Sequence, residues 1–434
     1  MALGGGTFLT QNKVLPGAYI NFVSAASASA TLSDRGYAAL GVELNWGAEG
    51  SIITVTSGDF IKNSKVLFGY SYDADEMKPL RDLFKYARTA YLYRLNSGGT
   101  KATNTFATAL FGGTRGNAIK IVIAANVDDP TKWDVSTYLD STMVDLQTVA
   151  TAAGLVANDY VTFKTDATLE ATAGLALAGG TNGTVTGESH QAFLNLAESY
   201  SFNAIGYVGT TSTIKALYAA FTARLRDEVG KKFQCVLHDY AGDYEGVVNV
   251  KNEVSDGATV ADAVYWTLGV IAGLAVNKSG TNKKYDGEYT ISVDYTQSQL
   301  EAAIKAGEFT FHQVDNDVRV LMDINSLVTT SDTKGDVFKD NQTIRVIDQI
   351  ANDIAVLFNT KYLGAVPNDN AGRISLWSDV VKHHKQLQDI RAIEDFEEDD
   401  VTVAQGDTKK AVVVNDAITV VNAMTQLYMT VTVA

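Results

Sequence analysis

The stretch from Leu427 to Val433 constrains the fold more than any other part of the sequence. Its apolar side chains, Leu427, Met429, Val431 and Val433, alternate strictly with Tyr and Thr. This two-residue repeat predicts a β-strand with one buried face. Because a strand carries hydrogen-bonding groups along both edges, this one needs partners either in its own chain or in another chain.

A hairpin is expected just before that strand. Val401–Val403 and Ala411–Val414 are short β-branched runs, and they flank a polar turn at residues 405–410 with Gly406-Asp407 at its centre. Two such runs around a glycine-containing polar turn predict a β-hairpin.

The N-terminal end carries a second short run that is typical of a strand. Residues 18–23 are rich in aromatic and β-branched side chains, of which Tyr19, Ile20 and Phe22 are the ones expected to pack. Residues 24–30 are only Ser and Ala, which predicts a flexible linker. Each terminal strand can pair within its own subunit, the usual case for a local segment, or with another subunit. The residues alone leave both arrangements open.

Composition places the chain among ordinary globular proteins. It has 434 residues, of which 46% are hydrophobic and 20% charged, and a chain of this length forms about two to four domains. The 35 basic and 50 acidic residues give a net charge of −15. This balance argues against a general nucleic-acid binder and against a binder of anionic membranes, since both need a basic surface. Residues 1–6 have no basic residue and no apolar run, so no signal peptide is expected.

Cys235 is the one cysteine in the sequence, which excludes an internal disulfide and any multi-cysteine metal site. It lies in the apolar run of residues 233–237, which predicts an inert buried thiol. The longest apolar run, residues 263–276, is too short to cross a bilayer of about 30 Å. It predicts a buried helix.

Four folded regions are expected after an N-terminal arm and linker at residues 1–30. Residues 31–96 combine short strands with one amphipathic helix, which predicts an N-terminal α+β domain. Residues 97–180 are rich in Thr and Ala and predict a β-rich module. Residues 181–310 show strand, amphipathic helix and strand, which predicts an α/β domain with a parallel sheet. Residues 311–434 form the last domain, with two helices and the hairpin.

The second of these two helices, residues 373–393, places His384 on its inner face and Lys382 and Lys385 on its outer face. Residues 394–400 follow and are all acidic except Phe396. The ordinary explanation for both charged groups is a solvated surface.

A glycine-rich run at residues 179–189 precedes a helix, as a phosphate-binding loop does. However, the run lacks the Gly-Lys-Ser/Thr ending, so no lysine reaches a phosphate. We therefore interpret Thr186 as the cap of the helix and the glycines as turn residues.

His238-Asp239 follows a strand of the α/β region, where catalytic groups of such sheets gather. No nucleophile accompanies them, because the sequence has no Gly-x-Ser-x-Gly elbow. The sequence also has no metal-binding histidine motif, and the adjacent pair His383-His384 points to different sides of a helix. We therefore expect no catalytic residue and no metal site. The five histidines are His190, His238, His312, His383 and His384.

Stretches spread along the sequence carry a family resemblance. They are Gly113–Asn117, Leu177–Gly183, Ala263–Gly273 with Asn277–Lys283, Arg319–Leu327 and Asp336–Asp348. In this order they resemble contractile tail sheath proteins of myophages, defective prophages and phage-tail-like bacteriocins. Asn182 stands where many sheath proteins have Asp in a Gly-Gly-x-Asp-Gly turn, and Asn suits such a turn equally well.

The resemblance implies a central α/β domain with a subtilisin-like fold and no catalytic residues. It also implies that each subunit lends an N-terminal strand to one neighbour and a C-terminal strand to another, completing a small sheet in the receiving C-terminal domain. Residues 18–23 and 427–433 match these roles in position and pattern. We therefore favour exchange over pairing within the subunit. The expected fold is α/β plus β-rich modules, with a C-terminal α+β domain and exchanged terminal strands.

The implied function is that of a structural subunit of a contractile sheath, which assembles helically around an inner tail tube and drives it through a target cell envelope. The implied partners are further copies in stacked hexameric rings, the tube protein, and baseplate and tail terminator proteins. Lys382 and Lys385 are the expected contacts to an acidic tube surface, and residues 97–180 are expected to face outward. No cofactor, nucleic acid or membrane insertion is expected, and the particle is expected to assemble in the bacterial cytoplasm and leave by lysis.

Two other classes stay open from the sequence. A surface-layer protein shares the Thr- and Ala-rich, acidic, cysteine-poor composition, but it needs an export signal. A hydrolase on a subtilisin-like sheet is the enzymatic alternative, and there His238 and Asp239 would be the residues to test.

Overall fold

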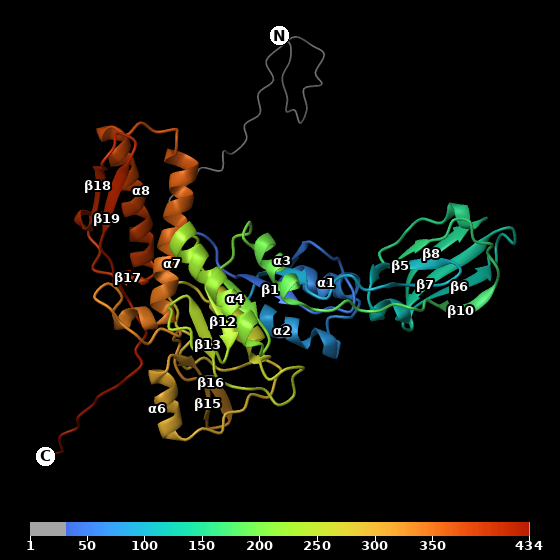
Figure 1. Cartoon of the computed structure of the whole chain (residues 1–434), viewed down its shortest axis with the longest axis horizontal. Helices are drawn as coiled ribbons and strands as arrows, with labels where there is room; N and C mark the ends of the chain where they lie inside the picture. Colours follow the sequence, from blue (N-terminus) through green and yellow to red (C-terminus); the bar gives the residue numbers. More distant parts are fainter. Residues whose placement is uncertain (1–31, 434) are drawn as a thin grey trace, which may run out of the picture. The chain divides into compact units, whose positions relative to one another are not determined.

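The computed structural model describes residues 32–433 (Figure 1). The described chain divides into two compact units, one made of residues 33–351 and 420–433 and the other of Leu32 with residues 352–419. No helix within the described residues is long and apolar enough to cross a membrane. The strand expected at residues 18–23, with Tyr19, Ile20 and Phe22, lies outside the described residues.

A seven-stranded sheet forms the centre of the first unit, in the order β14-β13-β12-β11-β1-β3-β2. Neighbouring strands from β14 to β3 run parallel, and β2 is antiparallel to β3. The strands are β1 (Tyr37–Val42), β2 (Ile52–Thr56), β3 (Thr89–Arg94), β11 (Ala204–Tyr207), β12 (Gln234–His238), β13 (Val247–Val250) and β14 (Glu308–Phe309). The parallel sheet predicted for residues 181–310 is confirmed.

The strands of residues 31–96 lie in this same sheet. β1 pairs with β3 on one edge and with β11 on the other, and its Ala38, Ala39 and Leu40 are fully buried. The regions expected as an N-terminal and a central domain therefore share one sheet and its core.

Helices cover both faces of the sheet. The amphipathic helices predicted in residues 31–96 and 181–310 are present, but residues 31–96 contain a second helix that was not predicted. One buried cluster includes side chains of α1 (Ser57–Phe68), α2 (Lys78–Phe84) and α5 (Ala263–Gly273), and a second includes α3 (Gly187–Ala197) and α4 (Ser212–Ala223). A π-helical segment, Arg224–Val229, continues α4.

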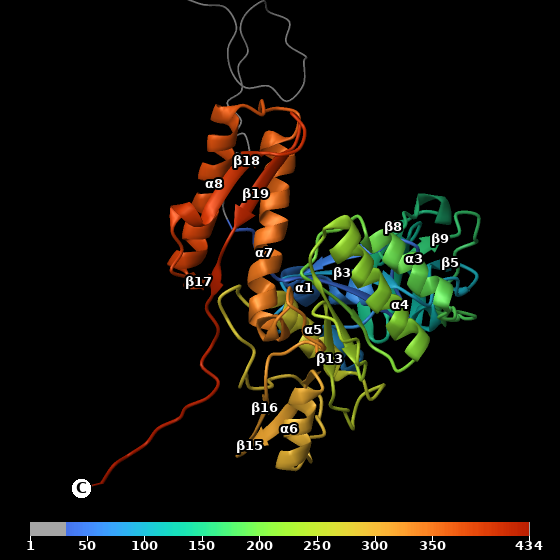
Figure 2. The ribbon, with the colours of Figure 1, turned by 60° about the vertical axis from the view of Figure 1, so that its left-hand side comes forward.

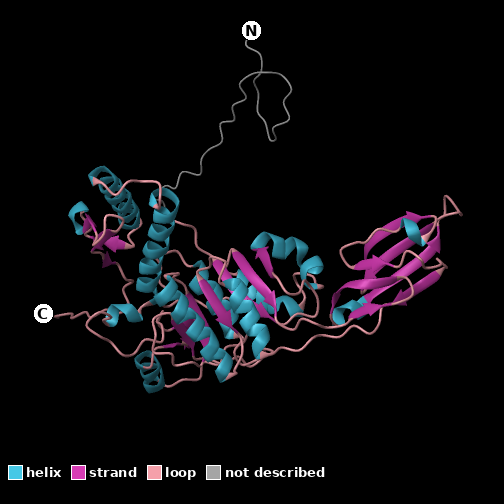
Figure 3. Ribbon diagram, turned by 45° about the horizontal axis from the view of Figure 1, so that its top comes forward, coloured by secondary structure: helices cyan, strands magenta, loops and turns pink. Residues whose placement is uncertain are grey.

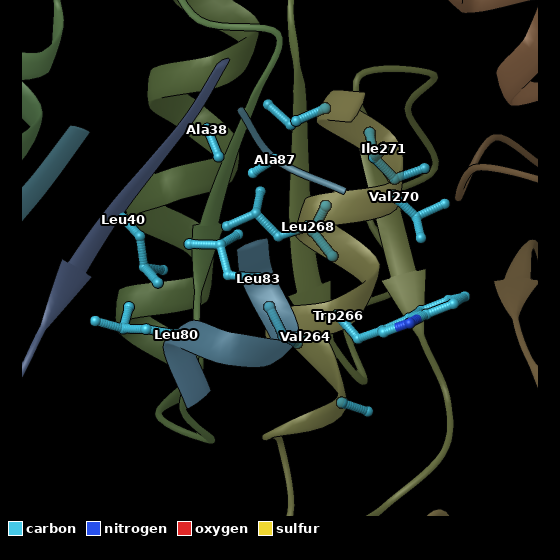
Figure 4. Close-up of a cluster of buried hydrophobic side chains, with 14 of the residues drawn as sticks. Ala38, Leu40, Leu80, Leu83, Ala87, Val264, Trp266, Leu268, Val270 and Ile271 are labelled. Atoms are coloured by element: carbon cyan, nitrogen blue, oxygen red, sulfur yellow. The ribbon is translucent and has the colours of Figure 1, made fainter. Parts of the chain in front are cut away.

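The apolar run predicted as a buried helix is α5, which packs against α2. Figure 4 shows Leu83 of α2 beside Leu268 of α5, and Leu80 and Val264 belong to the same buried cluster. A Cβ atom at Gly269 would lie 2.4 Å from the Leu83 carbonyl oxygen, and one at Gly273 would lie 2.0 Å from the Tyr86 carbonyl oxygen. The two glycines, four residues apart, therefore let the backbones of α2 and α5 approach closely.

Asp82, on the buried side of α2, is fully shielded from solvent. Its carboxylate accepts hydrogen bonds from the Tyr285 hydroxyl (2.9 Å) and the Glu288 amide (2.8 Å). Burial outweighs both hydrogen bonds and raises the pKa of Asp82 to about 6.

We expect Asp82 to make the protein less stable as pH rises. Between pH 4 and 6 the unfolded state loses this proton while the folded state still largely keeps it, so the free energy of unfolding falls by about 2 kcal/mol across that range. Urea unfolding at pH 4, 5, 6 and 7 measures it, and Asp82→Asn should flatten this part of the curve. The exposed Asp332→Asn is the control, and a curve for Asp82→Asn as steep as the parent's would contradict the prediction.

Residues 97–180 form the predicted β-rich module, drawn as magenta strands in Figure 3. A three-stranded sheet, β4-β5-β9, and a four-stranded sheet, β10-β6-β7-β8, enclose one buried cluster, to which Trp46 also belongs. The strands are β4 (Lys101–Thr103), β5 (Ala107–Gly112), β6 (Ile119–Ala125), β7 (Trp133–Leu139), β8 (Thr142–Val149), β9 (Val161–Phe163) and β10 (Thr172–Ala176).

The region expected as one last domain, residues 311–434, divides near residue 351. Its first part contains β15 (Phe311–Val314) and β16 (Asp317–Val320), and Phe311 and Val320 belong to the core of the central sheet. The helix α7 (Asn341–Leu357) begins in this same unit, which also holds α6 (Gln297–Lys305). A buried ion pair holds the first half of α7 in this unit, because Asp348 of α7 accepts two hydrogen bonds from Arg226, of 2.6 and 2.9 Å.

The second unit contains the long helix α8 (Asn370–Asp389), which matches the predicted helix at residues 373–393. It also contains the predicted hairpin, formed by β18 (Val401–Gln405) and β19 (Val412–Asp416) in antiparallel register. Two short strands lie on either side of the hairpin in sequence, β17 (Ile393–Glu394) and β20 (Thr419–Val420).

Candidate assembly interface

The C-terminal segment is extended and exposes its apolar side chains. Leu427, Met429, Val431 and Val433 are 69–88% exposed, and Met424 is fully exposed. The segment after β20, drawn in dark red in Figures 1 and 2, forms no strand with any other described segment. A hydrogen bond of 3.0 Å from Tyr428 to Gln426 stays within it.

The strand predicted at residues 427–433 is therefore not formed among the described residues. The alternating pattern is present, but a strand exists only when a partner satisfies its backbone N–H and C=O groups. Four apolar side chains on one face are left in contact with water instead, which is unfavourable in proportion to their area.

The hairpin of the second unit offers open strand edges. β18 and β19 form a two-stranded sheet among the described residues, and two strands alone make a marginal sheet. The sheet is held to α8 by a hydrogen bond from Trp377 Nε1 to the Val401 carbonyl oxygen (2.9 Å). Val413 and Val414 on β19 remain 45% and 37% exposed.

Lys382 and Lys385 lie on the exposed face of α8, as predicted. Lys385 forms an ion pair with Glu398 of the acidic loop, so part of its charge is already neutralised. Whether this face meets a tube stays a prediction.

His383 and His384 are both buried, and each has its own carboxylate partner. His383 Nε2 lies 2.9 Å from Asp353 Oδ2, and His384 Nε2 lies 2.9 Å from Asp416 Oδ2. The two rings thus point in different directions, as predicted, and they join α8 to α7 and to the end of β19.

His238 stands at the carboxyl end of β12, as predicted, and its imidazole is not paired with Asp239. Both ring nitrogens are buried without a hydrogen-bond partner, and burial lowers the pKa of the imidazole. The Asp239 carboxylate is 65% exposed and lies 4.0 Å from Lys251 Nζ, so it does not orient the histidine. Cys235 is fully buried, as predicted, and burial raises the pKa of its thiol to about 12.

The large cleft of the first unit lies elsewhere. It has a volume of about 1320 Å³, opens at the carboxyl ends of β1 and β11, and is lined by carboxylates including Glu43, Asp75 and Glu76. His238 is not among its lining residues. Within residues 32–433 no three His, Cys, Asp or Glu side chains gather as a metal site.

The glycine-rich run is packed against neighbouring backbone. A Cβ atom at Gly183 would lie 1.8 Å from the Ser97 carbonyl oxygen, which leaves no room for a phosphate on that side. Asn182 bridges two other segments, donating to Asn45 Oδ1 (2.7 Å) and accepting from the Thr114 amide (3.0 Å). Thr186 caps α3 in a capping box, as predicted.

Four family models match consecutive parts of the chain. They describe a tail sheath protein Gp18 domain III N-terminal region (residues 35–95), a phage tail sheath protein beta-sandwich domain (97–182), a phage tail sheath protein central domain (183–326) and a phage tail sheath C-terminal domain (333–434). The phage-like element PBSX protein XkdK of Bacillus subtilis (strain 168) is 35% identical over 99% of this chain and 100% of its own length. The chain belongs to the phage tail sheath family.

Solved structures agree with membership of the sheath family. The sheath tail protein of Desulfitobacterium hafniense is 41% identical, with a TM-score of 0.80 over 90% of this chain and 93% of that one. The helical sheath of the anti-feeding prophage in its contracted state shares the fold at 14% identity, with a TM-score of 0.56 over 96% of this chain and 98% of that one. The sheath protein is thus a structural subunit, and the surface-layer and hydrolase alternatives are not favoured.

Three of the stretches that carry the sheath resemblance, Asn277–Lys283, Arg319–Leu327 and Asp336–Asp348, meet in one buried network. Asp323 of Arg319–Leu327 forms an ion pair with Arg345 of Asp336–Asp348, and both side chains are at most 1% exposed. Asp323 also accepts hydrogen bonds from Asn341 Nδ2 (3.0 Å) and from the Gly280 amide (2.7 Å). The sequence alone assigns no role to these residues, because an ion pair between distant segments leaves no periodic pattern in the sequence.

Proposed function

We propose that this chain is the repeating subunit of a contractile sheath that surrounds an inner tail tube and drives it through a target cell envelope. The observation that carries the proposal is the C-terminal segment, whose alternating apolar side chains are exposed while the β18–β19 hairpin has open edges. A strand without an acceptor and a sheet without its outer strands are complementary features of one chain. The C-terminal segment of one copy can therefore pair with the hairpin of the next copy.

Strand exchange explains how a sheath holds together while it contracts. In the proposed assembly the segment at residues 427–433 adds to the hairpin of one neighbour, and residues 18–23 add to that of another. Such a contact does not close on itself, so it propagates as a helix, here built from stacked hexameric rings. The donated strands stay paired while the subunit bodies rotate about the connecting segments. The extended state is then a metastable one that a baseplate trigger releases.

Electron microscopy of the purified, concentrated protein tests this proposal. We expect rods or hollow cylinders from the full chain and none from a chain that ends at Asn422. Circular dichroism of the shorter chain should match a folded subunit, because the deleted residues are exposed. Rods of unchanged yield from the shorter chain would falsify the exchange of the C-terminal strand.

The remaining parts of the chain receive roles consistent with this assembly. The first unit is proposed to have a subtilisin-like arrangement without catalytic residues. The ring nitrogens of His238, which have no hydrogen-bond partner, support this proposal. The module at residues 97–180 is proposed to face outward, away from the tube. Baseplate and tail terminator proteins are the proposed partners at the two ends, with assembly in the cytoplasm and release by lysis.

Lys382 and Lys385 are the proposed contacts to an acidic tube surface. Because Lys385 is already paired with Glu398, Lys382 should carry most of the attraction. We expect Lys382→Glu with Lys385→Glu to reduce co-sedimentation with the tube protein several-fold at low salt, since like charges then face each other. The double variant Lys409→Glu with Lys410→Glu, in the exposed hairpin turn, makes the same change in net charge. Equal losses in both variants would exclude a specific contact at α8.

A further inference from the structure

The first turn of α7 holds the base of the C-terminal segment. Gln342 Nε2 donates to the Val421 carbonyl oxygen (2.9 Å), and Gln342 Oε1 accepts from the Ala423 amide (3.1 Å). The Thr343 hydroxyl donates to Asn422 Oδ1 (3.2 Å). We refer to Gln342, Thr343 and residues 421–423 as the tail clamp.

The two α7 side chains of the tail clamp are buried, and the chain becomes exposed directly after the clamp. Gln342 and Thr343 are each 2% exposed, whereas Met424, the first residue beyond the clamp, is fully exposed. The side-chain amide of Gln342 pairs with residues 421–423 through one donor and one acceptor, as the backbone of a neighbouring strand would. The chain is therefore fixed up to Ala423 and unattached to other described segments beyond it.

Residues 427–433 can in principle pair with the β18–β19 hairpin of their own chain or with that of a second subunit. The hairpin of their own chain therefore competes with the second subunit for the same strand. A short flexible connection gives an intramolecular partner an effective concentration of roughly millimolar. Residues 427–433 follow β19 by only ten residues, 417–426, which is a sufficient length for a loop back to its edge. Self-pairing would thus be favoured unless something opposes it.

We propose that the tail clamp opposes self-pairing and so directs residues 427–433 to a second copy of this chain. The clamp binds residues 421–423, which lie in the middle of the loop that self-pairing needs. In this proposal, a hairpin between β19 and the segment forms only after these three hydrogen bonds break. This inference rests on the proposed strand exchange and assigns Gln342 and Thr343 as its positioning residues.

Cysteine cross-linking of the full chain measures both pairings in one sample. Val413→Cys on β19 and Val431→Cys on the segment place two thiols at exposed positions, and the native Cys235 is fully buried and does not compete. A short bis-maleimide joins the thiols within one chain, which gives a cross-linked monomer, or between chains, which gives dimers and larger species. We expect Gln342→Ala to raise the yield of cross-linked monomer roughly tenfold or more, because two hydrogen bonds are lost.

Matched variants separate the clamp from the exchange and from folding. Thr343→Val removes one hydrogen bond at nearly constant volume, and it should raise the yield of cross-linked monomer about threefold to fivefold. It also serves as the test variant if circular dichroism shows that Gln342→Ala does not fold. Gln297→Ala, on the exposed face of α6, should change nothing. Unchanged monomer yield in Gln342→Ala and Thr343→Val overturns the clamp, whatever the dimer yield. Cross-linked monomer as the main product of the parent chain overturns strand exchange itself.

Discussion

Replacing Met429 and Val431 together by Asp should abolish rod formation by the full chain. Both side chains belong to the apolar face of the C-terminal segment and are 74% and 69% exposed in the subunit. The substitutions therefore leave the folded subunit intact, because they remove no buried contact. In an assembled sheath the same face would be buried, and two carboxylates without partners there cost several kcal/mol for each interface.

The alternation of apolar and polar side chains along residues 427–433 provides a matched control for this double substitution. Thr430→Asp with Thr432→Asp adds the same charge to the same strand, but on the opposite face. Electron micrographs and sedimentation should show rods for the control and free subunits for Met429→Asp with Val431→Asp. Equal loss of rods in both variants would mean that charge, and not the buried face, decides assembly.

Replacing Asp323 by Ala should lower the free energy of unfolding of the first unit by about 3–5 kcal/mol. The substitution leaves the guanidinium of Arg345 buried without its carboxylate and removes the acceptor for Asn341 and for the Gly280 amide. Urea unfolding followed by tryptophan fluorescence measures the change, since Trp266 is buried in the core of this unit.

An exposed ion pair provides the comparison for this buried one. Arg224 and Glu198 are 44% and 41% exposed, so Glu198→Ala should cost only about 0–1 kcal/mol. Asp323→Asn keeps the shape and part of the hydrogen bonding, and it should fall between the two. A cost for Asp323→Ala as small as that for Glu198→Ala would show that Arg345 finds other partners.

Periodic features of this protein could be predicted from sequence, and contacts between distant segments could not. The hairpin of β18 and β19, the buried helix α5 and the cap at Thr186 each depend on neighbouring residues, so their patterns are visible in the chain. The shared sheet was not predicted, because β1 is a short strand whose pairing with both β3 and β11 depends on tertiary packing.

The features of the candidate assembly interface also fall into local ones that the sequence indicates and tertiary ones that it does not. The exposed apolar pattern of residues 427–433 and the exposed lysines of α8 are local features that the sequence indicates. That the segment has no strand partner in the described chain could not be predicted, since a strand pattern says nothing about where its partner lies. Gln342 was missed because a buried glutamine that binds backbone looks like any other polar residue of a helix.

The exposed C-terminal segment has a consequence for the supply of subunits. Residues 417–433 contain no charged residue and no proline, which are the residues that normally keep an apolar strand from sticking to others. Each newly made subunit therefore carries a segment prone to aggregate until an acceptor covers it. Subunits made faster than growing sheaths can incorporate them should be lost to aggregates, so the yield of soluble protein depends on the number of open sheath ends.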